Sequence, residues 1–510
     1  MPKDPLQTLL RKTGPMRGGK LAALMSEGGA MTSATARQRL SRAKPPIHRF
    51  PVPLLPKKES FFYLESQRTN DHFWEAHLRD LRETNSIYAA ALDGLLAKGG
   101  IIPVERFATI SGAPIAMKKQ IAAAAVADKL ILAGILKKQN TVRYGECYAI
   151  ANQWLMSPEE EAMHARDLGE RIVLDAIRDW SRKMGLASYN KIAIRGEGHA
   201  NQIGQFQWDL TGPSYLLPLR RYDGANGFLA ADVFVDGRLD APHIQHFIRK
   251  AHLLRAASSS GDVLPMLVAD EFTGNALTVG HAAGIVLATP SNLFGHEVGA
   301  ALRSLITTLK NAAAIVAADP SRLSKMADDL LAFEGSAGTL RGVLFELICA
   351  YLAKADGSSV DIAVRAVDPK SGEKADIDVL KVQGKLGCTT IECKGRQADG
   401  VVDDLEVGKW LNKLGTIRAH LLKQERFQSM PLSSELWTSG QFTENALARL
   451  KSEKANRKKH PIDWKTGEEV RQLASTVKEK SIVRTLDDHF MRHPMAVAVD
   501  SFAKKALTPA

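Results

Sequence analysis

The C-terminal half of the chain contains charged residues whose types and spacing suit metal-dependent hydrolysis of phosphodiester bonds. They are Glu346, Asp378, Glu392 and Lys394. Glu392 and Lys394 are two residues apart on strand-like sequence, so their side chains project from one face of a strand. Carboxylate oxygens bind Mg²⁺, and an ammonium beside them orients or deprotonates the attacking water or neutralises charge that builds up on the phosphate. We take these four residues as the candidate catalytic group.

Two predicted strands bring two of the carboxylates together. Residues 387–394 have the period-two pattern of a strand, and 375–382 form the preceding strand, because 383–385 supply turn residues. Antiparallel pairing across this turn places Asp378 beside Glu392. Two carboxylates at that distance repel each other unless a cation lies between them, and Mg²⁺ is the usual cation next to phosphate.

A further carboxylate interrupts an apolar helix. Residues 342–353 are nearly all apolar apart from Glu346. Burying an unpaired carboxylate costs several kcal/mol, so Glu346 should face a cation or a polar site. The candidate metal ligands are therefore Asp378, Glu392 and Glu346.

The order of these residues resembles the motif of the PD-(D/E)xK (restriction-endonuclease-like) nuclease superfamily. Glu392 follows Asp378 by fourteen positions, Lys394 comes next, and Glu346 matches the acidic residue that many members carry on the helix before the first core strand. The resemblance covers residues 335–440, about a fifth of the chain. It implies an αβββαβ core and Mg²⁺-dependent cleavage of phosphodiester bonds, with Mn²⁺ as an alternative ion and DNA as the commonest substrate.

The sequence departs from this motif at one point. The proline that precedes the aspartate in the family is absent, and the segment reads Lys-Ala-Asp-Ile-Asp over 374–378. Asp376 is thus a second candidate for the metal-binding aspartate. Asp378 is preferred because Val379 follows it, as in the common acid-x-D-V form of the motif, and because it leaves a short hairpin. The alternative interpretation is an exposed hairpin whose Glu392 and Lys394 form a surface pair of little energetic value.

Composition limits the class of protein. A chain of 510 residues predicts three or four domains, and 45% apolar residues suffice for packed cores. The four cysteines show no metal-ligand spacing and no disulfide framework, which favours a reducing compartment. No apolar run approaches about 18 residues, and the N-terminus lacks a signal-peptide pattern. We therefore expect a cytoplasmic protein without a membrane partner.

Positive charge is concentrated near the N-terminus. The net charge is +12, and the first sixty residues hold twelve Lys and Arg against Asp4, Glu27 and Glu59, which gives +9. A polyanion fits this distribution through phosphate neutralisation and counterion release. We expect nucleic acid, double-stranded DNA above all, as the partner. A solvated basic tail without a partner is the alternative.

The N-terminal charge lies on a predicted helix-turn-helix unit with a wing. Helices are expected at 19–28 and from Thr32 or Ser33 to Ala43, and strands at 47–50 and 60–64, with the wing between the strands. Basic residues of the second helix and its end are the candidate DNA contacts, because recognition helices meet base edges and phosphates. They are Arg37, Arg39, Arg42 and Lys44.

A second copy of this unit is predicted to follow. Its helices are expected at 86–98, 104–110 and 117–135, with a closing strand at 142–150. Lys118 and Lys119 begin the third helix and are further candidate DNA contacts. Protein contacts or a purely architectural role are the alternative for this copy.

The middle of the chain predicts a helix, three strands, a helix and two further strands. Asp209 and Asp232 occupy motif-like positions, but Phe234 stands where the lysine would be. This pattern indicates a degenerate, inactive nuclease-like domain. An unrelated α/β domain with its own ligand is the alternative.

A helix is also predicted after the candidate catalytic strand, over 404–422. Lys409 and Lys413 share a face of it and are candidate phosphate clamps. Exposed basic helix surface is the alternative.

The sequence as a whole predicts a multidomain α/β protein: tandem winged helix-turn-helix units followed by a degenerate nuclease-like α/β domain and a C-terminal restriction-endonuclease-like αβββαβ domain. The expected segments are a winged-helix-like DNA-binding domain (1–75), a second winged-helix-like domain (76–155), the degenerate domain (156–297), a helical linker (298–334) and the nuclease domain with a basic helical extension (335–510).

Two functional classes stay open. The first is a Mg²⁺-dependent DNA endonuclease, which by analogy of layout suggests restriction or anti-phage defence. The second is a DNA-binding regulator or structural subunit of a nucleoprotein complex that keeps a nuclease fold without cleaving. A homodimer or a partner subunit is compatible with either class.

Overall fold

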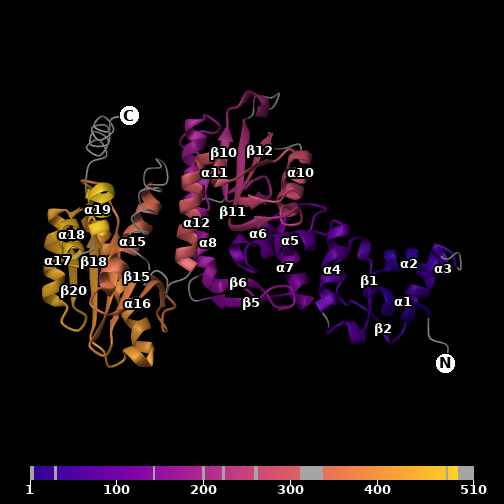
Figure 1. The fold of residues 1–510 in the computed structure, drawn as a ribbon, viewed down its shortest axis with the longest axis horizontal. Coiled ribbons are helices and arrows are strands. Elements are labelled where there is room, and N and C mark those ends of the chain that lie inside the picture. The colour runs from indigo at the N-terminus through magenta and orange to yellow at the C-terminus, as the bar shows by residue number, and fades with distance from the viewer. Residues whose placement is uncertain are drawn as a thin grey trace, which may run out of the picture. The chain divides into compact units, whose positions relative to one another are not determined.

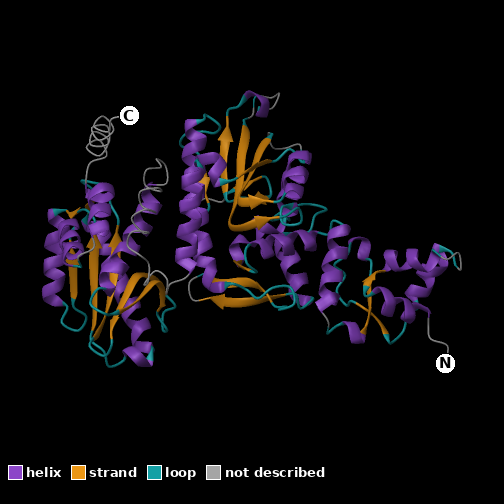
Figure 2. Cartoon of the chain, in the orientation of Figure 1, coloured by secondary structure: helices purple, strands orange, loops and turns teal. Residues whose placement is uncertain are grey.

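The computed structural model describes residues 5–27, 31–69, 71–141, 144–197, 201–220, 224, 226–257, 262–310, 337–477 and 480–491. Residue contacts divide the chain into two units, which are residues 1–164 with 181–289, and residues 165–180 with 290–510. The chain is a multidomain α/β protein with several mixed sheets and many helices (Figure 2). At this coarse level the predicted fold class is confirmed, while the finer domain boundaries stay predictions.

The N-terminal part of the first unit packs helices and short strands around its own apolar core, which includes Leu10, Leu21, Leu40 and Phe62. Its elements are α1 (Pro5–Thr13), β1 (Met16–Arg17), α2 (Gly18–Ser26), α3 (Ser33–Ser41), β2 (Ile47–Arg49) and β3 (Phe61–Leu64), with the sheet order β1-β3-β2. The two predicted helices and two predicted strands are confirmed here, whereas α1 and β1 were not predicted.

The start of α3 follows from its sequence. The hydroxyl of Thr32 accepts a hydrogen bond from the backbone N–H of Thr35 at 3.2 Å, which caps an otherwise unpaired amide of the first turn. Of the two predicted caps, Thr32 is therefore the one used.

The next segment repeats this order of elements. It comprises α5 (Ile87–Ala97), β4 (Ile101–Pro103), α6 (Phe107–Ser111), α7 (Ala123–Leu132), β5 (Leu136–Thr141) and β6 (Gly145–Ile150), with the sheet order β4-β6-β5. In both segments the strand that comes last in the sequence, β3 or β6, lies in the centre of the three-stranded sheet.

The predicted third helix of this segment, 117–135, was wrong at its start. Helix α7 begins at Ala123, so Lys118 and Lys119 lie in a turn before it and not on a helix. Lys119 has a φ of 63°, a left-handed conformation that an α-helix cannot contain. The helix ends before Gly134, whose φ of 70° is typical of helix C-termini.

The second segment shares one hydrophobic core with the middle of the chain. This core runs from Phe50 through Leu92 and Leu130 to Phe247 and Ile285. Helix α4 (Asp71–Glu83) contributes Phe73 and Leu81 to it. These parts of the first unit therefore pack as one body.

Within this core, His77 of α4 is buried without the polar contacts that would keep it charged. Its ring stacks on Phe61 with 4.4 Å between centroids, and its Nδ1 has no hydrogen-bond partner among the described residues. Burial lowers the pKa of His77 to about 3. Since the unfolded chain binds a proton near pH 6.5 and the folded chain does not, the free energy of unfolding falls as the pH drops from 6.5 toward 3.

We therefore predict that His77→Phe flattens the pH dependence of stability. Between about pH 6.5 and pH 5 the free energy of unfolding of the wild type should fall by about 2 kcal/mol more than that of the variant. This value follows from about 1.4 kcal/mol per pH unit for one bound proton. Urea unfolding at both pH values measures this difference. His72, whose side chain is exposed on the same helix, provides the control His72→Phe, which should follow the wild type. Parallel curves for the wild type and His77→Phe would contradict the prediction.

The middle sheet has the strand order β13-β12-β11-β10-β7. Strands β7 (Ala193–Ile194), β10 (Leu210–Ser214) and β11 (Gly227–Leu239) are antiparallel neighbours, whereas β12 (Val263–Phe272) and β13 (Val286–Ala288) run parallel to β11. Helix α9 (Gln245–Ala256) connects β11 to β12, and α10 (Gly274–Ala282) connects β12 to β13. The predicted helices before and after these strands are α8 (Glu160–Lys183) and α9, but the observed order differs from the prediction by α10 and by the short paired strands β8 (Gln202–Ile203) and β9 (Phe206–Gln207).

The C-terminal sheet has the order β14-β15-β16-β18-β20 and the same pattern of directions. Strands β14 (Ser359–Val367), β15 (Lys374–Gln383) and β16 (Gly387–Lys394) are antiparallel, and β18 (Leu432–Thr438) and β20 (Ile462–Lys465) run parallel to β16. Helix α15 (Ala337–Lys354) precedes the sheet, and α16 (Asp404–Lys423) and α17 (Glu444–Asn456) connect its parallel strands. The predicted hairpin and the predicted helix after it are confirmed.

Helices α15 and α16 cover opposite faces of this sheet (Figure 1). Cys349 of α15 contacts Cys393, and Lys413 of α16 contacts Glu392. Because Glu392 and Cys393 are consecutive on β16, their side chains point to opposite faces. The strand is therefore buried on both sides.

Two further helical predictions extend beyond the described residues. Of the predicted bridge 298–333, helix α12 (His296–Lys310) is described and the rest lies outside. The described part of the predicted helix 470–490 is divided into α18 (Gly467–Thr476), α19 (Lys480–Leu486) and the short helical segment η6 (Asp487–Met491). Within the part of the chain that the structure describes, no helix is long and apolar enough to span a membrane.

Candidate active site

Asp378 and Glu392 stand opposite each other on neighbouring strands. The β15–β16 register pairs Gln383 with Gly387 and continues to Val379 with Ile391, so the next position sets Asp378 against Glu392. The backbone N–H of Cys393 donates a hydrogen bond to Oδ2 of Asp378 at 2.7 Å. The hairpin thus fixes both carboxylates as the sequence predicts.

Glu392 lies between two lysine ammoniums. Its side chain is 5% exposed, and Oε1 accepts a hydrogen bond from Lys394 Nζ at 2.9 Å and another from Lys413 Nζ at 3.1 Å. Lys394 comes from the same strand, whereas Lys413 comes from α16. The structure thus places Lys413, expected only as a phosphate clamp, directly at the candidate site, while Lys409 one turn earlier is exposed.

The electrostatics of the site are dominated by crowded carboxylates. Burial, together with the negative charges of Glu392 and Glu346, raises the pKa of Asp378 well above its ordinary range. Burial opposes the charged form of Lys394, but the adjacent Glu392 outweighs it and raises the pKa of Lys394. Lys394 is therefore an ammonium at neutral pH.

Glu346 approaches the site from α15. It is half-buried on a helix whose neighbours Phe345, Leu347 and Ile348 are buried, and its charge raises the pKa of Asp378. Gly395 allows this approach, because a Cβ at that position would lie 2.6 Å from the backbone oxygen of Arg341 on α15. The end of β16 and the helix that carries Glu346 are thus in close contact.

The donor chemistry fits a divalent cation. Asp378 and Glu392 offer carboxylate oxygens, and Oδ1 of Asp378 accepts no hydrogen bond from any residue that the structure describes. A cation would also relieve the repulsion that raises the pKa of Asp378. In this conformation, however, Glu392 is engaged by lysines, and no three of the described His, Cys, Asp and Glu side chains are arranged to hold a metal ion.

The middle sheet contains a counterpart of this arrangement. Its register pairs Leu210 with Ala231, so the next position sets Asp209 against Asp232. Oδ2 of Asp209 accepts a hydrogen bond from the N–H of Val233 at 3.0 Å, as Asp378 does from Cys393. Asp209 and Asp232 therefore occupy the positions of Asp378 and Glu392.

The arrangement in the middle sheet also includes a lysine from the helix that follows the second acidic strand. Lys250 of α9 pairs with Asp232, and both side chains are fully buried. Since α9 follows β11 as α16 follows β16, Lys250 corresponds to Lys413. Phe234 stands at the position of Lys394, and Lys98 at the end of α5 lies 4.1 Å from its ring centroid and donates to the carbonyl of Val233 at 2.7 Å.

The two middle aspartates are closed off from solvent. Asp209 pairs with Arg195 at 2.8 Å, and despite complete burial the charges of Arg195 and Lys98 lower the pKa of Asp209 to about 2. Burial raises the pKa of Asp232 to about 6. Internal cations thus take the places at these carboxylates that a substrate or metal would need.

The lysine partners were missed from the sequence, although a signal for them exists. Lys250 lies on the apolar stripe of α9 with Phe247, Ala251 and Leu254, which are all buried. A lysine at such a position requires a buried acidic partner. Lys413 gives a weaker signal, because it lies between the buried Trp410 and Leu414 on α16 but its own side chain is partly exposed.

The remaining candidate contacts lie in the first unit. Arg37 and Arg39 on α3 and Arg42 and Lys44 after it are exposed, as are Lys118 and Lys119 in their turn. Arg39, Arg42 and Lys44 line one groove of about 510 Å³ beside α1, and Arg37 lies outside that groove. The structure therefore gathers three of the four N-terminal cations.

Comparison with known proteins gives little support for any family. No protein-family model matches the sequence, and no curated protein is significantly similar to it. The crystal structure of a protein of unknown function, AF1548, matches with 13% sequence identity and a TM-score of 0.20, over 26% of this chain and 67% of that one. A match of this identity and TM-score says nothing about the function of this chain.

Proposed function

We propose that the chain is a Mg²⁺-dependent nuclease that hydrolyses phosphodiester bonds in DNA, with its active site at Asp378, Glu392 and Lys394. The single observation that carries the proposal is the set formed at the end of β15 and β16: two opposed carboxylates, with an ammonium bound to one of them. A third carboxylate, Glu346, lies near enough to shift the pKa of Asp378.

The order of elements around the site supports the same proposal. Helix α15, the antiparallel strands β14, β15 and β16, helix α16 and the parallel strand β18 follow one another as in the αβββαβ core of restriction-endonuclease-like nucleases. In this order the two acidic strands are neighbours, and the helix after the second acidic strand lies over their ends. The resemblance therefore extends from the motif to the connectivity.

In the proposed reaction, water attacks the phosphorus and the bond to the leaving oxygen breaks. Asp378 and Glu392 would hold Mg²⁺, which when bound supplies positive charge to the phosphate and lowers the pKa of water. Lys394, which donates to Glu392, would orient or deprotonate the attacking water, or stabilise charge developing on the phosphate. Lys413 turns from Glu392 to the phosphate and serves as a second cation.

DNA binding is assigned to the first unit. The segments α1–β3 and α5–β6 each have the order helix, strand, helix, helix, strand, strand that winged-helix domains use, with the last strand in the centre of the sheet. In the first segment α3 takes the place of the recognition helix, and Arg39 of α3 lines a groove together with Arg42 and Lys44, which follow the helix. Restriction or anti-phage defence is the proposed setting.

Incubation of the full chain with supercoiled plasmid, linear duplex, single-stranded DNA and RNA tests this function. Cleavage of DNA in Mg²⁺ or Mn²⁺ and its loss in EDTA are expected. Absence of cleavage on every substrate, under conditions where duplex is bound, would instead support the second candidate function.

One observation favours that second candidate, a DNA-binding regulator or structural subunit with a nuclease fold. Glu392 already has cationic partners, as Asp232 has in the closed middle sheet. The two sites differ in exposure, however, because Lys394 and Lys413 have side chains 28% and 36% exposed, whereas that of Lys250 is fully buried. Accessible lysines can exchange Glu392 for a phosphate, and for this reason we prefer the nuclease.

The location of DNA affinity gives a separate prediction. Replacement of Arg37, Arg42 and Lys44 by glutamine should weaken duplex binding at low salt and flatten the dependence of log K on log [salt], by about 0.9 for each phosphate that is no longer neutralised. Fluorescence anisotropy over a salt series measures both effects. Glutamine at Lys451, Lys458 and Lys459, which are exposed in the second unit, is the matched control. A larger effect of the control would move the binding surface there.

A further inference from the structure

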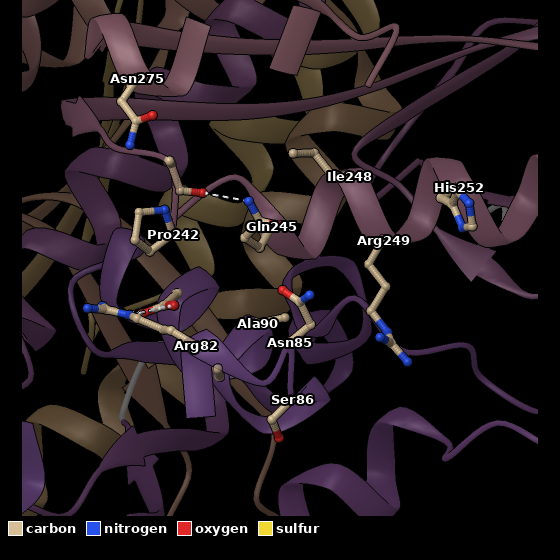
Figure 3. Close-up of a pocket in the computed structure, with 13 residues that line it drawn as sticks. Arg82, Asn85, Ser86, Ala90, Pro242, Gln245, Ile248, Arg249, His252 and Asn275 are labelled. Carbon is tan, nitrogen blue, oxygen red and sulfur yellow. Dashed lines mark hydrogen bonds and ion pairs between the residues drawn. The ribbon is translucent and has the colours of Figure 1, made fainter. Parts of the chain in front are cut away.

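A pocket in the first unit is lined by residues that belong to neither of the carboxylate clusters described above. It has a volume of about 490 Å³, within the roughly 300–1,000 Å³ typical of small-molecule sites. Its walls come from the end of α4 and the start of α5 on one side and from α9 and the start of α10 on the other (Figure 3). The shared core that joins these helices gives the pocket fixed walls.

Arg249 of α9 is the most informative residue of this pocket. It forms no ion pair with any described carboxylate, and its nearest acceptor is Gln120 Oε1 at a marginal 3.5 Å. Its Nε is buried without a partner among the described residues, and burial lowers the pKa of its guanidinium. Arg249 is half-buried, and partial removal of a guanidinium from water without a compensating anion is unfavourable, so this position favours an anionic ligand.

The second arginine of the pocket is held in a fixed orientation. Arg82 donates through Nε and Nη2 to the carboxylate of Asp93, whose side chain is 1% exposed. Its Nη1 donates to none of the described residues. Asp93 is the acidic residue of the lining and is neutralised by this pair, so the charge of Arg249 is left uncompensated.

The rest of the lining fits a ligand with both a polar and an apolar part. Side-chain amides of Asn85, Gln245 and Asn275 line the space, and Figure 3 shows the amide nitrogen of Gln245 bonded to the carbonyl of Ala241. Ala90, Pro242 and Ile248 form apolar wall between them. Guanidinium groups favour phosphate, and amides beside apolar wall suit the edge and face of a nucleobase.

We propose that this pocket binds a nucleoside phosphate as a free small molecule, with its phosphate on Arg249 and its base against Ala90, Pro242 and Ile248. The proposal is independent of the nuclease function, because every residue involved lies in the first unit. Such a site would make the first unit responsive to a nucleotide.

Calorimetric titration of the full chain with AMP, GMP, CMP and UMP tests the proposal. At least one should bind with a stoichiometry of one. Arg249→Ala should weaken that binding about 10- to 100-fold, the usual value of a charged hydrogen-bonded contact, and Arg249→Lys should restore part of it. Arg79→Ala is the matched control, since Arg79 is exposed on α4 outside the pocket and should not matter.

Several results would overturn the proposal. Failure of all four nucleotides to bind, or equal binding by folded Arg249→Ala, would remove the site. Inorganic phosphate binding as tightly as the nucleotide would show that the apolar wall is not used. Displacement of the nucleotide by a short duplex, with loss of duplex affinity in Arg249→Ala, would assign Arg249 to the nucleic-acid backbone. Circular dichroism of each variant excludes misfolding as the cause.

Discussion

Lys394→Ala should lower the rate of Mg²⁺-dependent DNA cleavage by about 10²–10⁴-fold, the usual contribution of a positioned proton-transfer or charge-stabilising group. Lys394 donates to Glu392 from the end of β16, and its side chain is 28% exposed, so its loss should leave the sheet intact. Cleavage of a labelled duplex under single-turnover conditions measures the rate, and anisotropy should show nearly unchanged duplex affinity.

The helix offers matched controls for this prediction. Lys413→Ala should also slow cleavage, because Lys413 shares Oε1 of Glu392 with Lys394. Lys409→Ala removes the same side chain one turn earlier, where it is exposed and has no contact with Glu392, and should leave the rate close to that of the wild type. Undiminished cleavage by Lys394→Ala, or equal effects at all three positions, would contradict the assigned role.

Asp232→Asn should destabilise the first unit by about 3–5 kcal/mol, because it removes the carboxylate that is paired with the fully buried Lys250. Urea unfolding measures the loss. Asp232→Asn combined with Lys250→Met should recover most of the stability, since replacing a buried pair by apolar side chains is often neutral. Glu392→Gln, in the accessible site, should lower the free energy of unfolding much less than Asp232→Asn does.

Alanine variants of Asp209 and Asp232 test whether the middle sheet is catalytic. Below their unfolding transitions, Asp209→Ala and Asp232→Ala should cleave DNA at the rate of the wild type. Loss of cleavage in either protein, with unaltered circular dichroism, would mean that the middle sheet contains a second working site. An Asp232→Asn protein as stable as the wild type would contradict the buried ion pair between Asp232 and Lys250.

Local signals in the sequence were sufficient for the elements around the candidate site. The alternating strand pattern and the turn at 383–385 predicted β15 and β16, and with them the opposition of Asp378 and Glu392. Thr32 predicted the start of α3. These features depend on contacts between residues close in sequence, which a pattern can encode.

Contacts between distant residues were beyond the same reasoning. Glu392 and Lys413 are 21 residues apart and meet only because α16 folds back over the sheet, and Lys98 reaches Val233 across 135 residues. The start of the helix predicted over 117–135 was wrong for a different reason. Alanine-rich sequence favours helix, but Lys119 adopts a left-handed turn that intrinsic propensity does not reveal.

The most direct test of the nuclease proposal is the Mg²⁺ dependence of duplex cleavage by the wild type and by Glu392→Gln. The proposal predicts that wild-type cleavage rises with Mg²⁺ to saturation, stops in EDTA and returns when Mg²⁺ is added in excess. Glu392→Gln should not cleave at any Mg²⁺ concentration. Cleavage that persists in EDTA, or equal cleavage by Glu392→Gln, would contradict it.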